Sequence, residues 1–170
     1  MLTHKLTTLF FLLEMDLQSV KRYLEKDAEE NDETASCIDR MPFRFFEVFI
    51  LKGLRVDHAS PGRVVCSMNV PQRLLNHGNS LHGGATATLV DIVGSAAIRS
   101  LDHPITGVSV EINVSYMDAA YLDEEIEIEA NVLRLGKAIA VVSVELRKKK
   151  DGKIIAQGRH TKYLPPASRI

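Results

Sequence analysis

The clearest pattern in the chain is an alternation of apolar and polar residues in its second half. Between Val108 and Tyr116 the even-numbered positions are apolar and the odd-numbered ones polar. This period of two is typical of a strand with one buried face. The alternation returns in residues 125–132, 140–146 and 154–163, with turn signals at Gly136-Lys137 and Asp151-Gly152. Because short turns join antiparallel neighbours, these segments predict an antiparallel sheet.

Two more strand candidates lie between Pro42 and Val70, joined by Ser60-Pro61-Gly62, a combination that favours a tight turn. A hairpin is therefore predicted there. Residues from Gly83 to about Ser100 are apolar nearly all round when placed on a helix, which predicts a buried helix. Together these elements predict an α+β domain in which a curved antiparallel sheet of about six strands wraps around one long buried helix.

The segment before Pro42 differs in character from the predicted domain. Apolar residues at helical spacing predict a short amphipathic helix from Met15 to about Lys26, and the acidic run 27–33 reads as a linker. The apolar run Leu9 to Leu13 is too short for a membrane-spanning helix. We therefore divide the chain into an N-terminal extension (1–41), a folded domain (42–164) and a tail (165–170), with Met15 as a candidate natural start.

Composition narrows the function. The 170 residues are 45% hydrophobic, enough for one core, and 21 basic against 22 acidic residues give a net charge of -1. The near-zero net charge therefore gives no overall electrostatic attraction to nucleic acid or to an anionic membrane, and no membrane insertion is expected. Cys37 and Cys66 lack metal-ligand spacing and predict neither a metal site nor a disulfide scaffold, which favours a soluble protein in a reducing compartment.

Asp91 is the only formally charged side chain from Gly83 through Ile98. An unpaired carboxylate in apolar surroundings costs several kcal/mol unless hydrogen bonds offset it. One interpretation is a general base or nucleophile, because a desolvated carboxylate accepts protons better near neutral pH. The other is a structural aspartate satisfied by Ser, Thr or backbone donors. The residue pattern alone leaves both open.

The helix is preceded by His82-Gly83-Gly84. Two glycines at a helix start let a ligand approach the backbone, where free N–H groups can hold an oxyanion or a polarised carbonyl. The alternative is an ordinary turn, with His82 as a cap or a packed side chain. Upstream, Asn76, His77 and Asn79 offer further hydrogen-bonding groups in a polar loop.

The segment from Asn76 to Asp91 resembles the active-site stretch of the hotdog-fold acyl-CoA thioesterases, in the branch of the phenylacetate-pathway enzymes and thioesterase superfamily member 2. Gly107 to Val110, Asn113 to Met117 and Ala156 to Lys162 resemble the same family, in the same order and with similar spacing. The resemblance covers about 42–164 and implies the hotdog fold.

The resemblance also implies a site. Asn76 and the Gly83 backbone N–H would bind and polarise the thioester carbonyl, and Asp91 would activate water or attack directly. Ser109 would assist Asp91, and His82 would support substrate positioning or product release. In this family the carbonyl-binding pair (Asn76 and Gly83 here) and the Asp/Ser pair (Asp91 and Ser109 here) come from different subunits. A homodimer is therefore implied, usually paired into a tetramer. Neither a metal nor a cofactor is implied, since coenzyme A belongs to the substrate and product.

Coenzyme A is expected along strand ends and turns. The residues implied by the resemblance are Tyr116, Met117, Asp118, Ala119, Ala120, Tyr121, Arg134, Leu135, Gly136, Lys137, Ala138, Ile139 and Tyr163. A glycine turn with two cations, as in Arg134 to Lys137, can itself present N–H groups and charge to phosphates, although an ordinary hairpin turn has the same composition.

Two other functions fit the same residues: a hotdog hydroxyacyl-thioester dehydratase, which relies on a histidine with an acidic partner and could use His82, and a non-catalytic acyl-CoA-binding module. The sequence ends in Ser168-Arg169-Ile170, which resembles a peroxisomal address. We therefore expect a peroxisomal location, with the cytosol and the mitochondrion as alternatives.

Overall fold

The structure, a computed structural model, describes Ser19, Cys37 and residues 40–103 and 106–165. The chain divides into two compact units, Met1–Phe45 and Phe46–Ile170. The predicted helix from Met15 to Lys26, except Ser19, lies outside the described residues, and so does the terminal Ser168-Arg169-Ile170. Both therefore stay predictions.

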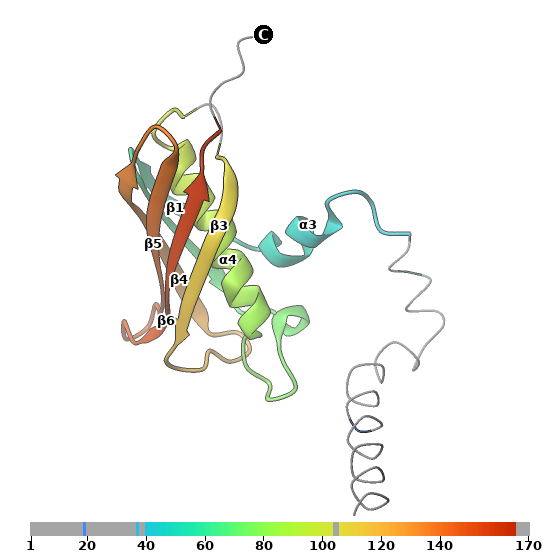
Figure 1. Cartoon of the computed structure of the whole chain (residues 1–170). Coiled ribbons are helices and arrows are strands. Elements are labelled where there is room, and N and C mark those ends of the chain that lie inside the picture. The colour runs from blue at the N-terminus through green and yellow to red at the C-terminus, as the bar shows by residue number, and fades with distance from the viewer. Residues whose placement is uncertain (1–18, 20–36, 38–39, 104–105, 166–170) are drawn as a thin grey trace, which may run out of the picture. The chain divides into compact units, whose positions relative to one another are not determined.

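Six antiparallel strands form one sheet in the order β1-β2-β4-β5-β6-β3 (Figure 1). Their bounds are Arg55–Ser60 (β1), Arg63–Asn69 (β2), Val108–Tyr116 (β3), Glu125–Leu135 (β4), Ile139–Lys148 (β5) and Ile154–Tyr163 (β6). The strands predicted from alternation are confirmed. So is the first hairpin, in which Ser60 pairs with Arg63 across the turn.

Strand β3 lies at one edge of the sheet, yellow beside the red β6 in Figure 1. It pairs with β6 and not with β4, the next strand in the chain, because β4 already lies between β2 and β5. Among its apolar residues, Val108 and Val110 are each 62% exposed, and only Val114 packs against the core. The expectation that this alternating segment buries one whole face is therefore wrong for the single chain.

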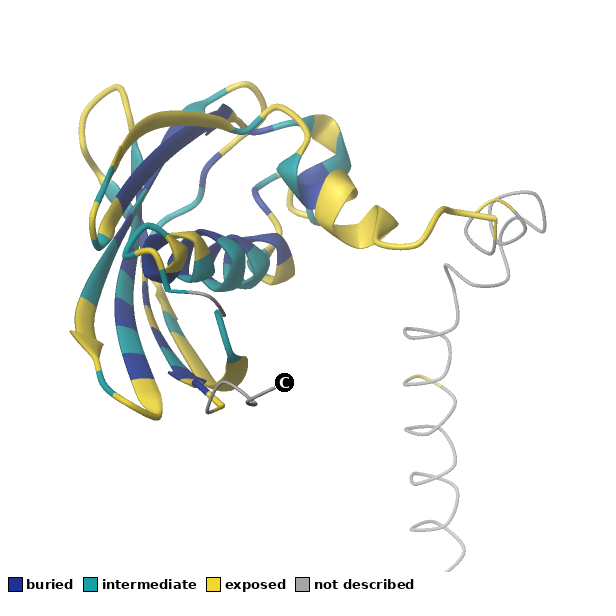
Figure 2. Ribbon diagram, turned by 90° about the horizontal axis from the view of Figure 1, so that it is seen from above, coloured by how far each residue is buried: buried dark blue, intermediate teal, exposed yellow. Residues whose placement is uncertain are grey.

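The predicted long helix is confirmed as α4, Gly83–Arg99, and the sheet curves around one side of it (Figure 2). Its buried residues are Ala85, Thr86, Leu89, Val90, Val93, Gly94, Ala97 and Ile98. Its other side, which includes Thr88, Asp91, Ser95 and Ala96, is half-buried or exposed. In one chain the curved sheet therefore covers one side of the helix and leaves the other side partly open.

Close packing fixes α4 over β6. A Cβ built at Gly158 on β6 would lie 2.7 Å from Val90 Cγ1 and 2.9 Å from Cγ2. Real carbon contacts are about 3.5–4.0 Å, so only glycine fits here. The helix therefore sits directly on β6 at the residue that precedes Asp91.

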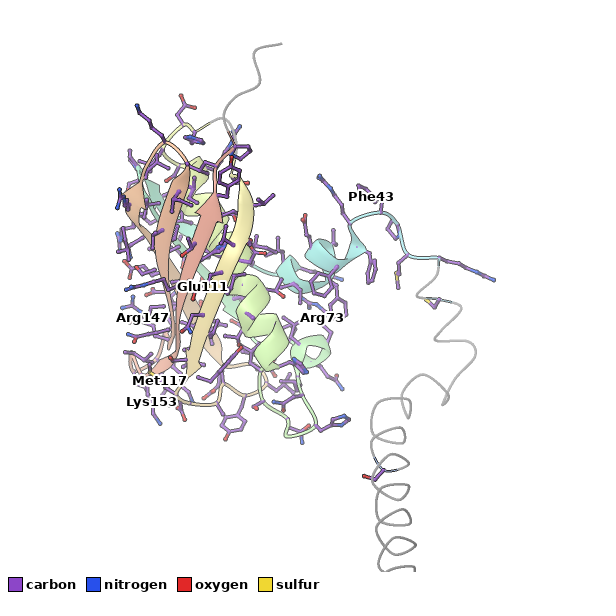
Figure 3. The ribbon with its side chains drawn as sticks, in the orientation of Figure 1. Phe43, Arg73, Glu111, Met117, Arg147 and Lys153 are labelled. Atoms are coloured by element: carbon purple, nitrogen blue, oxygen red, sulfur yellow. The ribbon has the colours of Figure 1, made fainter. Side chains whose placement is uncertain are left out.

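Two elements were not predicted from the sequence. Helix α3, Phe45–Leu51, precedes β1, and a short 3-10 helix, η1, spans Gln72–Leu74. Arg73, labelled in Figure 3, donates from Nε to the Phe49 carbonyl at 2.6 Å and from Nη2 to the Lys52 carbonyl. These bonds satisfy carbonyls at the end of α3. None of the described helices is long and apolar enough to cross a membrane.

Candidate active site

The carboxylate of Asp91 lies among three polar side chains from β3 and β6. Its Oδ1 is 3.3 Å from Ser109 Oγ, 3.4 Å from His160 Nε2 and 3.7 Å from Lys162 Nζ. The side chain of Asp91 is 41% exposed. Asp91 therefore has polar partners that offset the cost of a carboxylate in an apolar helix. All three of these contacts are given by Oδ1, and Oδ2 accepts no hydrogen bond from the described residues, which leaves that oxygen available to a ligand.

A β-bulge places Ser109 on the helix side of the sheet. The pairing between β3 and β6 shifts between Ser109 and Glu111, so Val110 has no partner in the register. Tyr116 also faces α4, since its hydroxyl donates to the Gly83 carbonyl at 3.1 Å. Residues 109 and 116 are an odd number apart and would face opposite sides of a regular strand. The extra residue reverses this, and it explains why the alternation placed Ser109 on the solvent face.

His160 lies fully buried beneath this pair, with Nε2 2.9 Å from Ser109 Oγ. Burial lowers the pKa of the imidazole from 6.5, as does the nearby charge of Lys162, while Asp91 acts in the opposite direction. The ring is therefore neutral at pH 7. Its Nδ1 has no hydrogen-bond partner among the described residues. Because buried unpaired N–H groups are rarer than unpaired acceptors, we assign the proton to Nε2.

This assignment gives the hydrogen bonds a direction. His160 Nε2–H donates to Ser109 Oγ, and the Ser109 hydroxyl donates to Asp91 Oδ1. A Ser-His-Asp triad needs the serine and the aspartate on different ring nitrogens. Here both lie at Nε2. Ser109 therefore has no base that could make it a nucleophile, and it acts instead as a donor to the carboxylate.

Lys162, which pairs with Ser109 across the β3–β6 ladder, is 5% exposed. Its Nζ donates to Ser95 Oγ on α4 at 2.7 Å. Burial lowers the pKa of the ammonium, and Asp91 opposes that change. Sequence reasoning assigned no role to His160 or Lys162. A signal existed: both occupy the even-numbered positions of β6 that face the helix, where apolar or small residues are expected.

At the start of α4, His82 is the N-cap, and its Nδ1 accepts from the Gly84 N–H at 2.9 Å. Of the alternatives open from the sequence, the structure supports the cap. The Gly83 N–H has no acceptor among the described residues, as expected for a first-turn donor. Asn76 Oδ1 accepts from the backbone N–H groups of Gly78 and Ser80, at 2.8 and 3.2 Å, which fixes the loop before the helix.

Known proteins resemble this fold and site. A family model described as the Thioesterase superfamily matches residues 78–155. The human protein named acyl-coenzyme A thioesterase 13 is 46% identical over 115 residues, which cover 68% of this chain and 82% of that protein. The chain belongs to the thioesterase superfamily.

Solved structures confirm the hotdog fold. Zebrafish thioesterase superfamily member 2 has a TM-score of 0.68 and 40% identity, covering 88% of this chain and 98% of that one. The mouse protein of the same name has a TM-score of 0.67 and 39% identity, with 79% and 99% covered.

The site residues expected from the sequence fall into two groups within one subunit. Asn76 and Gly83 lie at the start of α4, whereas Asp91 and Ser109 lie farther along the helix. At about 1.5 Å per residue, Gly83 and Asp91 are about 12 Å apart along the helix axis. One thioester carbonyl cannot reach both groups in a single chain. Among the described residues, no group of three His, Cys, Asp or Glu side chains could hold a metal ion.

The expected coenzyme A residues also separate. Tyr116 ends β3, and it and the residues up to Tyr121 lie beside the start of α4, at the sheet end where Figure 3 labels Met117 and Lys153. Arg134 to Ile139 form the β4–β5 turn, where Ile139 pairs with Tyr163. Since the eight residue steps of β3 separate these ends, the groups lie about 26 Å apart.

Individual members of these two groups differ in what they can offer a ligand. The side chain of Ala120 is buried, and its carbonyl accepts from Leu81 N–H. The carboxylate of Asp118 lies 2.8 Å from Lys153 Nζ, a contact that lowers its pKa. The Gly136 N–H donates to the Ile139 carbonyl at 2.8 Å and is used within the turn. The exposed ring of Tyr121 and the cation of Lys137 are accessible.

Proposed function

We propose that this thioesterase hydrolyses acyl-coenzyme A to a free acid and coenzyme A, at a site completed by a second copy of the chain. The relative named acyl-coenzyme A thioesterase 13 supports the substrate class. The observation that carries the chemistry is the one-sided anchoring of Asp91, whose Oδ1 lies within 4 Å of three polar side chains while Oδ2 accepts no hydrogen bond from the described residues.

In the proposed mechanism, the Asn76 amide and the Gly83 N–H polarise the thioester carbonyl. Asp91 Oδ2 takes a proton from water as the water oxygen bonds to the carbonyl carbon. The developing oxyanion is stabilised by the two donors. The intermediate then collapses, the C–S bond breaks, and the proton passes to the departing thiolate. Neither redox chemistry nor a further reactant is needed.

Direct attack by Asp91 is the other route open to this geometry. A single turnover in ¹⁸O-labelled water distinguishes the two. If Asp91 acts as a base, the first acid released carries the label. If it attacks the carbonyl, coenzyme A leaves and an acyl-aspartyl anhydride forms, and water that opens this anhydride at the Asp91 carbon puts the label in Asp91 and releases an unlabelled first acid. An unlabelled first acid together with label in an Asp91 peptide therefore identifies direct attack.

The geometry supports a homodimer paired along β3. This strand is an edge with exposed Val108 and Val110, and such edges pair readily with another strand. Antiparallel pairing of two β3 strands sets the Tyr116 end of one copy against the Val108 end of the other. That arrangement places the start of one α4, with Gly83, near the partner copy's equivalent of Asp91. A dimer of dimers, implied by the family resemblance, belongs to the same proposal.

Thiol release from acyl-CoA tests the proposal directly. We expect Asp91→Ala and Asp91→Asn to lower kcat by about 10²–10⁴-fold, the range for loss of a general base. Near-normal turnover by both variants contradicts the mechanism. Release of free thiol also separates hydrolysis from the dehydratase alternative, for which His82 offers little support because it serves as a helix cap. Tight acyl-CoA binding without turnover would support the binding module instead.

Mixed dimers test the shared site. Asn76→Ala and Asp91→Ala chains should each be nearly inactive alone, but a mixed dimer would contain one intact site. After unfolding and refolding an equal mixture, random pairing predicts about a quarter of the wild-type activity. A mixture no more active than its components would show that each subunit works with its own residues only.

A further inference from the structure

Among the described lysines and arginines, Lys162 is the only one in the buried class. Lysines are almost never buried without a partner, because removing an ammonium from water is unfavourable. In the sheet, Lys162 pairs with Ser109 on β3 and with Ala140 on β5, and its side chain reaches Ser95 on α4. This position lies directly behind the proposed catalytic carboxylate.

The charged and titratable groups around Lys162 are few. Asp91 faces it from α4, and His160 lies two residues away on β6. Strand β3 contributes the uncharged Ser109, and the β5 residues paired with Lys162 and His160 are Ala140 and Val142. Because buried His160 is neutral, Lys162 is the only described cation within 4 Å of Asp91 that is charged at pH 7.

We propose that Lys162 is a positioning residue, whose ammonium balances the negative charge of Asp91 and holds Oδ1 towards β6, so that Oδ2 faces the reacting water. The 3.7 Å separation from Oδ1 and the 2.7 Å hydrogen bond to Ser95 Oγ carry this inference. Ser109 can orient the carboxylate but carries no charge. The inference rests on the proposed function and adds a residue to it.

The dimer strengthens this role. Pairing along β3 would cover the exposed side of Asp91 and remove water from around it. Charge interactions grow as the local dielectric falls. A carboxylate that must stay ionised in such a site therefore depends more on a fixed cation than it does in the open single chain.

The test compares the pH dependence of kcat for wild type, Lys162→Met and Lys162→Arg. Met has a similar length and no charge, while Arg keeps the charge. We expect Lys162→Met to move the acidic limb of the kcat profile upward by about one pH unit, which lowers kcat about 10-fold on that limb. KM should change less than about two-fold, because Lys162 is buried and its side chain meets Ser95 and Asp91. Lys162→Arg should keep the wild-type limb. Lys150→Met, which removes an exposed lysine at a hairpin end, is the matched control.

A Lys162→Met limb that coincides with the wild-type limb overturns the inference, whether or not kcat falls uniformly. If Lys162→Met fails to fold, Lys162→Gln removes the charge but keeps a donor for Ser95, and the same shift is expected. An unmoved limb in that variant also overturns it. Full turnover by Asp91→Ala is a separate outcome, since it removes the proposed function and not only the role of Lys162.

Discussion

Substitution of Gly158 should disturb both stability and catalysis through one contact. In Gly158→Ala the new methyl would lie 2.7 Å from Val90 Cγ1, nearly 1 Å inside an ordinary contact. Val90 is fully buried, so it has no free space to move into. Overpacking of this kind costs about 1–3 kcal/mol, and we expect that loss in the free energy of unfolding.

Catalysis should fall as well, because Asp91 follows Val90 in α4. A helix lifted from β6 lengthens the contacts of Asp91 with Ser109 and His160. A misplacement of about 1 Å can reduce turnover about 100-fold, so a loss of about 10-fold or more in kcat is expected. Urea unfolding at one protein concentration measures the first effect, since the proposed dimerisation would make stability concentration-dependent. Thiol release measures the second.

Val90→Ala supplies the control. Alone it removes two buried methyl groups and should cost about 2 kcal/mol. Combined with Gly158→Ala it makes room for the new methyl, so the double variant should be more stable than the sum of the single losses by about 1–3 kcal/mol. Simple additivity, or a Gly158→Ala protein as stable as wild type, would refute the close packing of α4 on β6.

Three further predictions concern single side chains. The free energy of unfolding should fall as pH drops below 6.5, by at most about 1.4 kcal/mol per pH unit, because His160 has a lowered pKa when folded and the unfolded chain takes up the proton first. His160→Gln should flatten urea midpoints over that range, and an unchanged slope counts against the buried neutral ring. Maleimide at pH 7.5 should label exposed Cys37 readily and Cys66 only in denaturant, since Cys66 is buried and burial raises its pKa to about 11. Peptide mass spectrometry measures the labelling, and equal labelling of the two thiols without denaturant would contradict this prediction. Val110→Glu should place like charges opposite each other along the proposed β3 pairing and so halve the mass measured by sedimentation, whereas Val110→Thr should not. Dimers of normal affinity in Val110→Glu would argue for another interface.

Much of the fold could be predicted because its signals are periodic. Alternation in residues 125–132 and 140–146 identifies strands, and the apolar run from Gly83 identifies a helix. Helix α3 was missed since its seven residues, Phe45–Leu51, are nearly all apolar and show no period. A short apolar run of this kind fits a strand or a helix equally well. The position of β3 at the edge depends on long-range pairing, which no local pattern records.

The site was predictable in part for the same reason. Asp91 stands out as a charge in an apolar helix, and it does meet Ser109. Its surroundings were not readable, since His160 and Lys162 reach it from a strand about 70 positions later. Both residues occupy positions of β6 that face the helix. This could have identified them, because buried polar side chains need hydrogen-bonding partners such as Asp91.

The bulge at Val110 links the site to the proposed assembly. In a regular strand, side chains alternate between the two faces of the sheet, so if Tyr116 faced α4, Ser109 would face away from it. Because of the extra residue, both ends of β3 contact α4. Tyr116 contacts it at Gly83, and Ser109 contacts it at Asp91. The same edge is the one left open to a second copy. A strand that carries both the donor to the carboxylate and the proposed pairing edge makes geometry at Asp91 depend on assembly, so loss of the dimer should reduce turnover even when every site residue is intact.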